Sequence, residues 1–147
     1  AGRARAEIAR QWAAKMVAAI RKHDRRHLIS IGMLPFGEGD YGFSPKTIAP
    51  EVDFLCVHLY PTSGKLDHEL KIAAKFAAAG KPVIIEEMFP LRCKADELGQ
   101  FIDESKKHVS GWIGFYWGQT PAELKQSTKI GDALMLAWLD LFQKAKP

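Results

Sequence analysis

The chain has 147 residues, 47% of them hydrophobic, which is enough to bury a core and fits one domain over residues 1–147. Its net charge of +4 comes from 21 basic and 17 acidic residues spread along the chain, and the main basic cluster, residues 21–27, carries no interleaved aromatic residues. That cluster is typical of a solvated helix end, so no nucleic-acid partner is expected.

No apolar run is long enough to cross a bilayer, which argues against a membrane partner. Cys56 and Cys93 are too few for a disulfide framework and have no metal-ligand spacing.

The first part of the chain predicts a helix, a strand and a loop. Apolar residues at helical spacing predict an amphipathic helix with one buried face; they are Ile8, Trp12, Met16, Ala19 and Ile20. Residues 27–34 predict a strand that Pro35 ends, and the glycine-rich residues 36–42 predict a loop above it. Ser44 and Pro45 fit the cap and first position of a short helical turn.

Three further strands alternate with helices. Residues 54–60 predict a strand whose aliphatic face, Leu55, Val57 and Leu59, belongs under helices and whose other face carries Phe54, Cys56, His58 and Tyr60. A helix follows, with Asp67 as its cap and Gly80 as its stop. Residues 83–87 predict a short buried strand, residues 96–109 a helix, and residues 111–117 a last strand with Ile113, Phe115 and Trp117 on one face. A final helix from about residue 130 carries the apolar stripe Leu134, Trp138, Leu141 and Phe142.

The strand at residues 83–87 ends in two adjacent carboxylates, Glu86 and Glu87. In parallel α/β folds, ligands and chemistry gather at the C-terminal ends of the strands. Because consecutive strand residues point to opposite faces, the two glutamates are expected to have different roles. One should face a cleft or barrel lumen, while its neighbour turns towards the helices or pairs with a cation.

The order of elements, a helix and then four strand–helix units without a hairpin signal, predicts an α/β fold with a parallel sheet. This order does not choose between an open sheet and a closed barrel. A (β/α)8 barrel needs about 250 residues and eight strands, so on the barrel interpretation the four strands are half of one. The rival is a small flavodoxin-like domain that binds a phosphate or nucleotide, although the glycines at 37–42 lack the spacing of a phosphate loop.

Three motifs stand at the predicted strand ends: His-Leu-Tyr-Pro at 58–61, Val-Ile-Ile-Glu-Glu at 83–87 and Phe-Tyr-Trp-Gly at 115–118. In this order and spacing they resemble the last four strands of a clan A glycoside hydrolase, most similar to the cellulase and mannanase family five. The resemblance implies half of a TIM (β/α)8 barrel, strands five to eight, with Glu87 as the catalytic nucleophile. It also implies that His58 and Tyr60 lie beside the nucleophile and that Trp117 lies under the sugar. The family often has an aromatic residue and a glycine after the nucleophile, where this chain has Met88 and Phe89.

Retaining glycoside hydrolysis uses two carboxylates about 5 Å apart, one attacking the anomeric carbon and one donating and then removing a proton. On the resemblance Glu87 attacks, and the Tyr60 hydroxyl donates a hydrogen bond that favours its ionised form and fixes its direction. His58 bonds a sugar hydroxyl or orients its neighbours. Aromatic rings that could stack on a pyranose are Trp117, Phe36 and Tyr41. No cofactor and no metal is expected.

The partner acid of this clan directly follows an asparagine, and the chain contains no asparagine. Glu38 and Asp40 lie in the loop at 36–42, but their spacing does not support that role. The chain is therefore expected to be a fragment of an endoglucanase- or mannanase-like hydrolase that supplies the nucleophile and is inactive alone. The expected partners are a polysaccharide or oligosaccharide substrate, and either the missing N-terminal half of the barrel or a second copy joined through open sheet edges. The alternative is a non-catalytic carbohydrate-binding remnant. The residues do not specify the glycan, and a secreted or periplasmic location suits the full-length parent.

Overall fold

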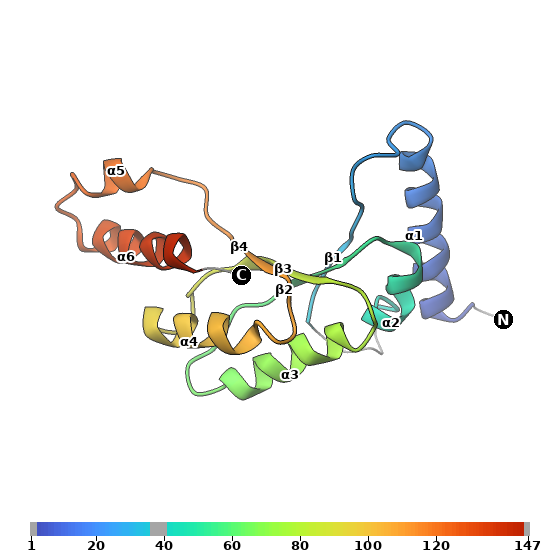
Figure 1. The fold of residues 1–147 in the computed structure, drawn as a ribbon, viewed down its shortest axis with the longest axis horizontal. Coiled ribbons are helices and arrows are strands. Elements are labelled where there is room, and N and C mark those ends of the chain that lie inside the picture. The colour runs from blue at the N-terminus through green and yellow to red at the C-terminus, as the bar shows by residue number, and fades with distance from the viewer. Residues whose placement is uncertain (1–2, 36–40, 146–147) are drawn as a thin grey trace.

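The structure, a computed structural model, describes residues 3–35 and 41–145. Its centre is a sheet of four parallel strands in the order β1-β2-β3-β4 (Figure 1). The strands are β1 (Gly32–Met33), β2 (Leu55–His58), β3 (Val83–Met88) and β4 (Gly111–Gly114). The predicted α/β class and parallel sheet are confirmed. Strands that are consecutive in the chain are also neighbours in the sheet, so the order has no reversal point of the kind at which doubly wound sheets bind nucleotides.

Helices occupy the connections between the strands. They are α1 (Arg5–Arg21), α2 (Pro45–Ile48), the 3-10 helix η1 (Ala49–Glu51), α3 (Leu66–Ala77), α4 (Ala95–Ser105), α5 (Pro121–Leu124) and α6 (Ile130–Lys144). α3 and α4 cover one face of the sheet, whereas α1 and α6 stand at its two ends (Figure 1). Among residues 3–35 and 41–145, no helix has the length and apolar character that a membrane span requires.

Local sequence signals set several helix ends. The Thr47 amide donates to Ser44 Oγ at 3.2 Å, so Ser44 caps α2 as predicted. Gly80 has a φ of 78°, the left-handed conformation that favours glycine, shortly after α3 ends. The prediction that Asp67 caps α3 is wrong, because α3 begins directly after Lys65. Asp67 instead lies in the first turn, where a negative charge favours the helix dipole.

The first strand is shorter than the predicted residues 27–34, because only two residues join the ladder. Ile29 bonds instead to the loop ahead of β2: its amide donates to Asp53 Oδ2 at 2.6 Å, and its carbonyl accepts from the Asp53 amide at 2.9 Å. The Ser30 hydroxyl donates to the Phe54 carbonyl at 2.8 Å. Arg21 pairs with the same Asp53 carboxylate, which ties the end of α1 to this loop.

The core lies between the sheet and the helices α3 and α4. The aliphatic face of β2 is fully buried there, as the alternation predicted. Side chains from the two helices complete this core; they are Leu70, Ala73 and Phe76 from α3, and Leu98, Phe101 and Ile102 from α4. Because these helices cover one face only, the opposite face of the sheet stays open for polar side chains.

The prediction that α1 buries its apolar stripe is wrong. Ile8, Trp12, Met16 and Ile20 are 50%, 48%, 46% and 41% exposed. The residues that α1 buries are two alanines that border this row, Ala9 and Ala13. Helical periodicity correctly grouped the large side chains on one face, but nothing in the described part of the chain covers that face fully.

Replacing Leu98 by alanine should lower the free energy of unfolding by about 2–5 kcal/mol, because Leu98 is fully buried and its removal leaves a cavity in the core. Urea denaturation followed by circular dichroism measures the effect. Leu91, which is 66% exposed, is the matched control, and Leu91→Ala should change the value by no more than about 0.5 kcal/mol. Equal losses in the two variants would contradict the assignment of the core.

Candidate active site

A tyrosine and a glutamate meet at the C-terminal end of the sheet. The Tyr60 hydroxyl, two residues beyond β2, donates to Glu87 Oε1 in β3 at 2.5 Å. Burial raises the pKa of the Tyr60 hydroxyl well above its ordinary value, and the hydrogen bond to Glu87 raises it further. The phenol therefore stays protonated and remains a donor to the carboxylate. The sequence predicted this pair, and the structure brings its members together.

His58 lies between the two adjacent glutamates. Its Nε2 is 3.1 Å from Glu86 Oε1, and its Nδ1 is 2.9 Å from Glu87 Oε2. All three side chains are partly buried. His58 thus contacts both carboxylates. Glu87 has two polar partners, His58 and Tyr60. This arrangement fixes the direction of the Glu87 carboxylate.

The two glutamates were expected to point to opposite faces of the strand. This expectation is wrong, because both carboxylates contact His58. The pairing of β2 with β3 runs from Val57↔Ile85 to His58↔Glu87, so that β3 has one extra residue, Glu86, at this step. Such a bulge breaks the strict alternation of side chains and re-aims those beside it. It allows Glu86 and Glu87 to reach the two nitrogens of the same ring.

Glu86 belongs to a small polar cluster that the sequence did not reveal. The Cys56 thiol on the neighbouring strand is close enough to Glu86 for the carboxylate to affect its pKa. Burial raises the pKa of Cys56 to about 12; Ser30 acts against this shift and Glu86 acts with it, so the thiol stays protonated. On β1, a Cβ at Gly32 would stand 2.3 Å from Glu86 Oε1 and 2.7 Å from His58 Nε2. Gly32 therefore leaves the space in which these two side chains meet.

Phe115 is a second residue that the sequence analysis did not assign to the site. Its ring packs edge-on against Tyr60, with 6.5 Å between the ring centroids. It follows β4 and shares an exposed face with Ile113 and Trp117, as the alternation predicted. Strand alternation could have identified Phe115, because it lies two positions before Trp117 and therefore on the same face.

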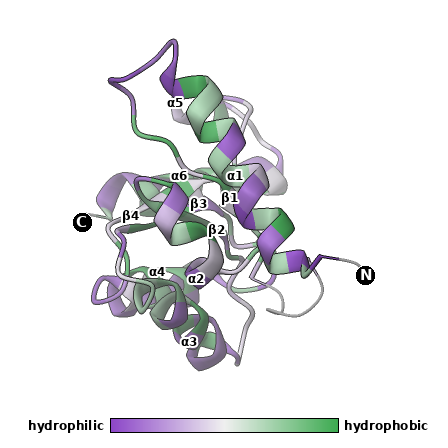
Figure 2. Ribbon diagram, turned by 90° about the vertical axis from the view of Figure 1, so that its right-hand side faces the viewer, coloured by the Kyte–Doolittle hydropathy of each residue, from purple (hydrophilic) through white to green (hydrophobic). Residues whose placement is uncertain are grey.

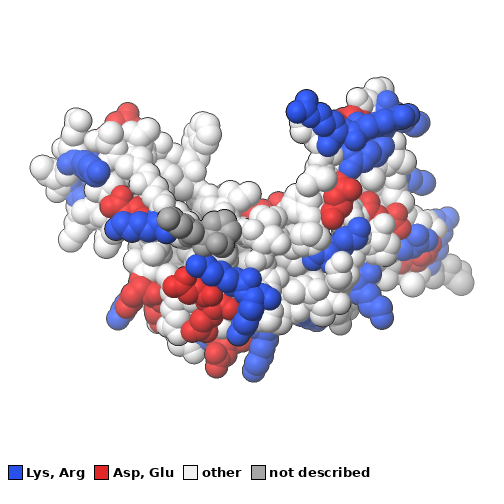
Figure 3. Space-filling model, viewed as in Figure 1, with Lys and Arg blue, Asp and Glu red and all other residues white. Residues whose placement is uncertain are grey.

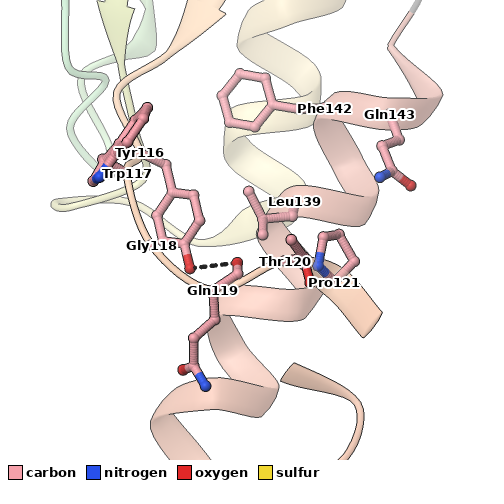
Figure 4. Close-up of a pocket in the computed structure, with 9 residues that line it drawn as sticks. All are labelled: Tyr116, Trp117, Gly118, Gln119, Thr120, Pro121, Leu139, Phe142 and Gln143. Atoms are coloured by element: carbon pink, nitrogen blue, oxygen red, sulfur yellow. Dashed lines mark hydrogen bonds between the residues drawn. The ribbon is translucent and has the colours of Figure 1, made fainter. Parts of the chain in front are cut away.

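Trp117 is fully exposed. It lies on the rim of a hollow of about 480 Å³ between the end of β4 and α6, and Tyr116 forms the wall of that hollow (Figure 4). The Tyr116 hydroxyl donates to the Gln119 carbonyl at 2.9 Å, which holds the chain that follows Trp117 (Figure 4). The Tyr60–Glu87 pair is not part of this hollow. Trp117 thus stands at the same end of the sheet without joining the polar cluster.

The remaining candidates lie apart from the cluster. Phe36, Glu38 and Asp40 fall outside the described residues. Tyr41 is 67% exposed and lines a hollow with Trp12 on α1. In residues 3–35 and 41–145, no group of three or more His, Cys, Asp or Glu side chains is arranged to hold a metal ion.

Gly32→Ala should separate His58 from Glu86 with little loss of stability, because the atoms in the way are the ends of movable side chains. Two-dimensional NMR of the histidine side chains should show a shift of the His58 signals. Gly131, which has open space around it, is the matched control, and Gly131→Ala should leave those signals in place. Unchanged His58 signals in Gly32→Ala would contradict the close packing of this cluster.

The raised pKa of Tyr60 predicts a loss of stability at high pH. Its contribution is fully present below the pKa of an unfolded tyrosine, 10.0, and is lost as the pH rises through the higher folded value. Tyr60→Phe should therefore weaken the alkaline loss of stability and remove the last phenol ionisation seen by ultraviolet titration. Tyr41→Phe should leave that last ionisation in place. Its persistence in Tyr60→Phe would show that another tyrosine is the buried one.

The fold is similar to parts of two solved glycoside hydrolases. The chain matches the endo-1,4-beta-mannanase from Rhizomucor miehei with a TM-score of 0.60 at 18% sequence identity, over 95% of this chain and 47% of the mannanase. It matches Bacteroides uniformis beta-glucuronidase 2, covalently bound to cyclophellitol-6-carboxylate aziridine, with a TM-score of 0.52 at 13% identity, over 75% of this chain and 15% of the glucuronidase. No protein-family model and no curated protein sequence matches the chain. It spans about half the length of the mannanase, and its four parallel strands alternating with helices match part of a glycoside hydrolase barrel.

Proposed function

We propose that this chain is the nucleophile-bearing part of a retaining glycoside hydrolase, with Glu87 as the nucleophile. The observation that carries the proposal is the hydrogen bond from Tyr60 to Glu87 at the C-terminal end of a parallel sheet. Catalytic groups of (β/α)8 enzymes lie at that end. The two fold neighbours, a mannanase and a glucuronidase, support the same class of reaction.

The residues around Glu87 suit an attacking carboxylate. In the first step, one Glu87 oxygen forms a bond to the anomeric carbon while the glycosidic C–O bond breaks, and the departing oxygen takes a proton from a second carboxylic acid. Tyr60 and His58 each contact a different oxygen of Glu87, which holds the carboxylate in one orientation before attack. In the second step, a water oxygen bonds to the anomeric carbon, the bond from that carbon to Glu87 breaks and frees the carboxylate, and the second carboxylate takes the proton of the water.

The second carboxylate is proposed to come from outside this chain, since the spacing of Glu38 and Asp40 does not support that role. Glu86 is the acid nearest to this arrangement in the described chain, but it already bonds to His58 on the open face of the sheet, and its charge acts on the Cys56 thiol. A general acid needs room for the leaving group of the substrate. The chain by itself is therefore proposed to be inactive on substrates whose leaving group requires a proton.

Polysaccharides or oligosaccharides of the β-1,4-mannan or glucan type are the proposed substrates. The fully exposed ring of Trp117 and the ring of Phe115 beside Tyr60 offer apolar surfaces on which a pyranose could stack. The name of the mannanase among the fold neighbours favours mannan as the first substrate to test.

A glycoside with a leaving group that departs without a proton isolates the first step. With 2,4-dinitrophenyl β-mannoside, tested beside the β-glucoside, the purified chain should release a burst of at most one equivalent of dinitrophenolate, because deglycosylation lacks its base. Mass spectrometry should locate the glycosyl group on Glu87. Glu87→Gln should abolish the burst and the adduct.

Glu86→Gln is the matched control, since it removes the neighbouring carboxylate and should retain an adduct on Glu87. Steady turnover of an ordinary aryl glycoside by the chain alone would contradict the assignment of an external acid. Failure to form any adduct, combined with mannan binding that survives Glu87→Gln and is lost in Trp117→Ala, would favour the non-catalytic carbohydrate-binding alternative.

A further inference from the structure

Glu86 is an acidic side chain of the polar cluster to which the proposed reaction assigns no role. Its Oε1 is 3.1 Å from His58 Nε2, while Glu87 Oε2 is 2.9 Å from the other ring nitrogen, Nδ1. The imidazole therefore lies between the proposed nucleophile and a second carboxylate. Any change that Glu86 makes to the protonation of His58 acts directly on Glu87.

The two contacts determine how many protons the imidazole carries. An ionised carboxylate only accepts hydrogen bonds, whereas a neutral imidazole has one N–H donor and one lone pair. A neutral His58 would therefore point a lone pair at one of the two glutamates. In the doubly protonated ring both nitrogens carry a proton, and each carboxylate faces a positively charged partner. The geometry thus favours a positively charged His58.

Lysine and arginine do not compensate the two glutamates in the described chain. Among residues 3–35 and 41–145, neither Glu86 nor Glu87 forms an ion pair with a lysine or an arginine. Figure 3 shows lysines and arginines gathered over α1 and over the side of α3 and α4, and a depression between the α1 end and the α5–α6 end that is largely free of them. A positive His58 therefore offsets the repulsion between the two carboxylates that it contacts.

The side of this cluster that faces β1 and α1 is apolar. Gly32 on β1 leaves the space in which His58 and Glu86 meet. Next to it, a hollow of about 300 Å³ is lined by Trp12, Met33 and further hydrophobic side chains. Figure 2, seen from the α1 side, shows hydrophobic bands along this helix. Charges interact more strongly beside apolar groups than in water, so these surroundings strengthen the contact between His58 and Glu86.

The charges of this cluster change during the proposed reaction. In the glycosyl-enzyme, one Glu87 oxygen is bonded to the anomeric carbon, so Glu87 has lost its negative charge. A positive His58 then faces a neutral ester on one side and the Glu86 carboxylate on the other. An opposite charge nearby favours the charged form of a histidine, so Glu86 keeps the second proton on the ring at this stage. When the bond between Glu87 and the sugar breaks, the negative charge returns beside a positive donor that is already in place.

We propose that Glu86 is a positioning residue that keeps His58 positively charged, so that His58 stabilises the Glu87 carboxylate as it leaves the sugar. Glu86 acts through His58 and does not itself touch the substrate. The inference rests on the proposed function, because it assigns a role in the second step of that reaction. The protonation of His58 is measured without any glycoside, so this part is tested independently.

Nitrogen NMR of the histidine side chains at neutral pH measures the number of protons on His58. The unaltered chain should show a ring with both nitrogens protonated, identified as the signal that His58→Gln removes. Glu86→Gln should convert it to a ring with one protonated nitrogen, because an amide has no charge to hold the second proton. Gly32→Ala, which moves the same two side chains apart, should act in the same direction.

Glu104→Gln is the matched control, because Glu104 lies on α4, on the other side of the sheet, and accepts a hydrogen bond from Gln100. This substitution should leave the His58 signals unchanged. Circular dichroism should show the same fold in both glutamine variants, since the Glu86 side chain is 29% exposed and glutamine has nearly the same size.

Azide isolates the second chemical step in the chain alone, because it is an anion that needs no base. An azide nitrogen bonds to the anomeric carbon, the bond from that carbon to Glu87 breaks, and Glu87 leaves as a carboxylate. With the dinitrophenyl glycoside that forms the adduct, Glu86→Gln should slow azide-dependent turnover about tenfold more than it slows the initial burst. A merely structural defect would slow both steps alike, and Glu104→Gln should change neither rate.

Two results overturn the inference: a His58 ring with a single protonated nitrogen in the unaltered chain, or equal slowing of the two steps in Glu86→Gln. If no adduct forms on Glu87, the proposed function fails. The nitrogen signals then still decide the contact on which the inference depends. Two protons that become one in Glu86→Gln support a charged His58 held by Glu86, and unchanged signals overturn it.

Discussion

The geometry of the site depends on one irregularity in the strand pairing. If β2 and β3 had kept a regular register through His58, one of the two glutamates would have pointed towards the helices. The extra residue at Glu86 instead lets one imidazole contact both carboxylates, at 3.1 and 2.9 Å. Bulges of this kind are common beside functional sites because they re-aim a side chain without disturbing the strand below. The buried segment Val83–Ile85 under this bulge keeps its regular pairing with β2.

The two faces of the sheet differ in the side chains they carry. The face under α3 and α4 is aliphatic and closed, and its residues are among the most deeply buried in the chain. The other face carries the groups that need partners: a glutamate bonded to a tyrosine, a histidine between two carboxylates and a protonated thiol. Buried polar groups are costly unless they are satisfied, and no buried side-chain nitrogen or oxygen in the described residues lacks a hydrogen-bond partner. The stability of one face therefore supports a fixed polar arrangement on the other.

The proposed chemistry concerns the open side of the sheet, on which Glu87 and its partners lie. A retaining mechanism requires a second carboxylate about 5 Å from the nucleophile. In the part of the chain that the structure describes, Glu87 and its partners lie on the face of the sheet opposite α3 and α4. An enclosed site strengthens the electrostatic contacts on which such a reaction depends.

The sequence by itself determined the α/β class, the parallel order, the buried face of β2, the cap at Ser44 and the stop at Gly80, because each depends on periodicity or on the conformational preference of one residue. Its resemblance to the glycoside hydrolases also indicated Tyr60 and Glu87, and both stand at strand ends of neighbouring units. Only the tertiary structure decided that Glu86 joins Glu87 at His58, because register is set between strands that lie 28 residues apart at this contact. Only the structure placed Phe115 on Tyr60 and gave Gly32 its role as the space for two side chains. It also left the apolar row of α1 exposed, because periodicity shows which residues share a face and not whether a neighbour covers it.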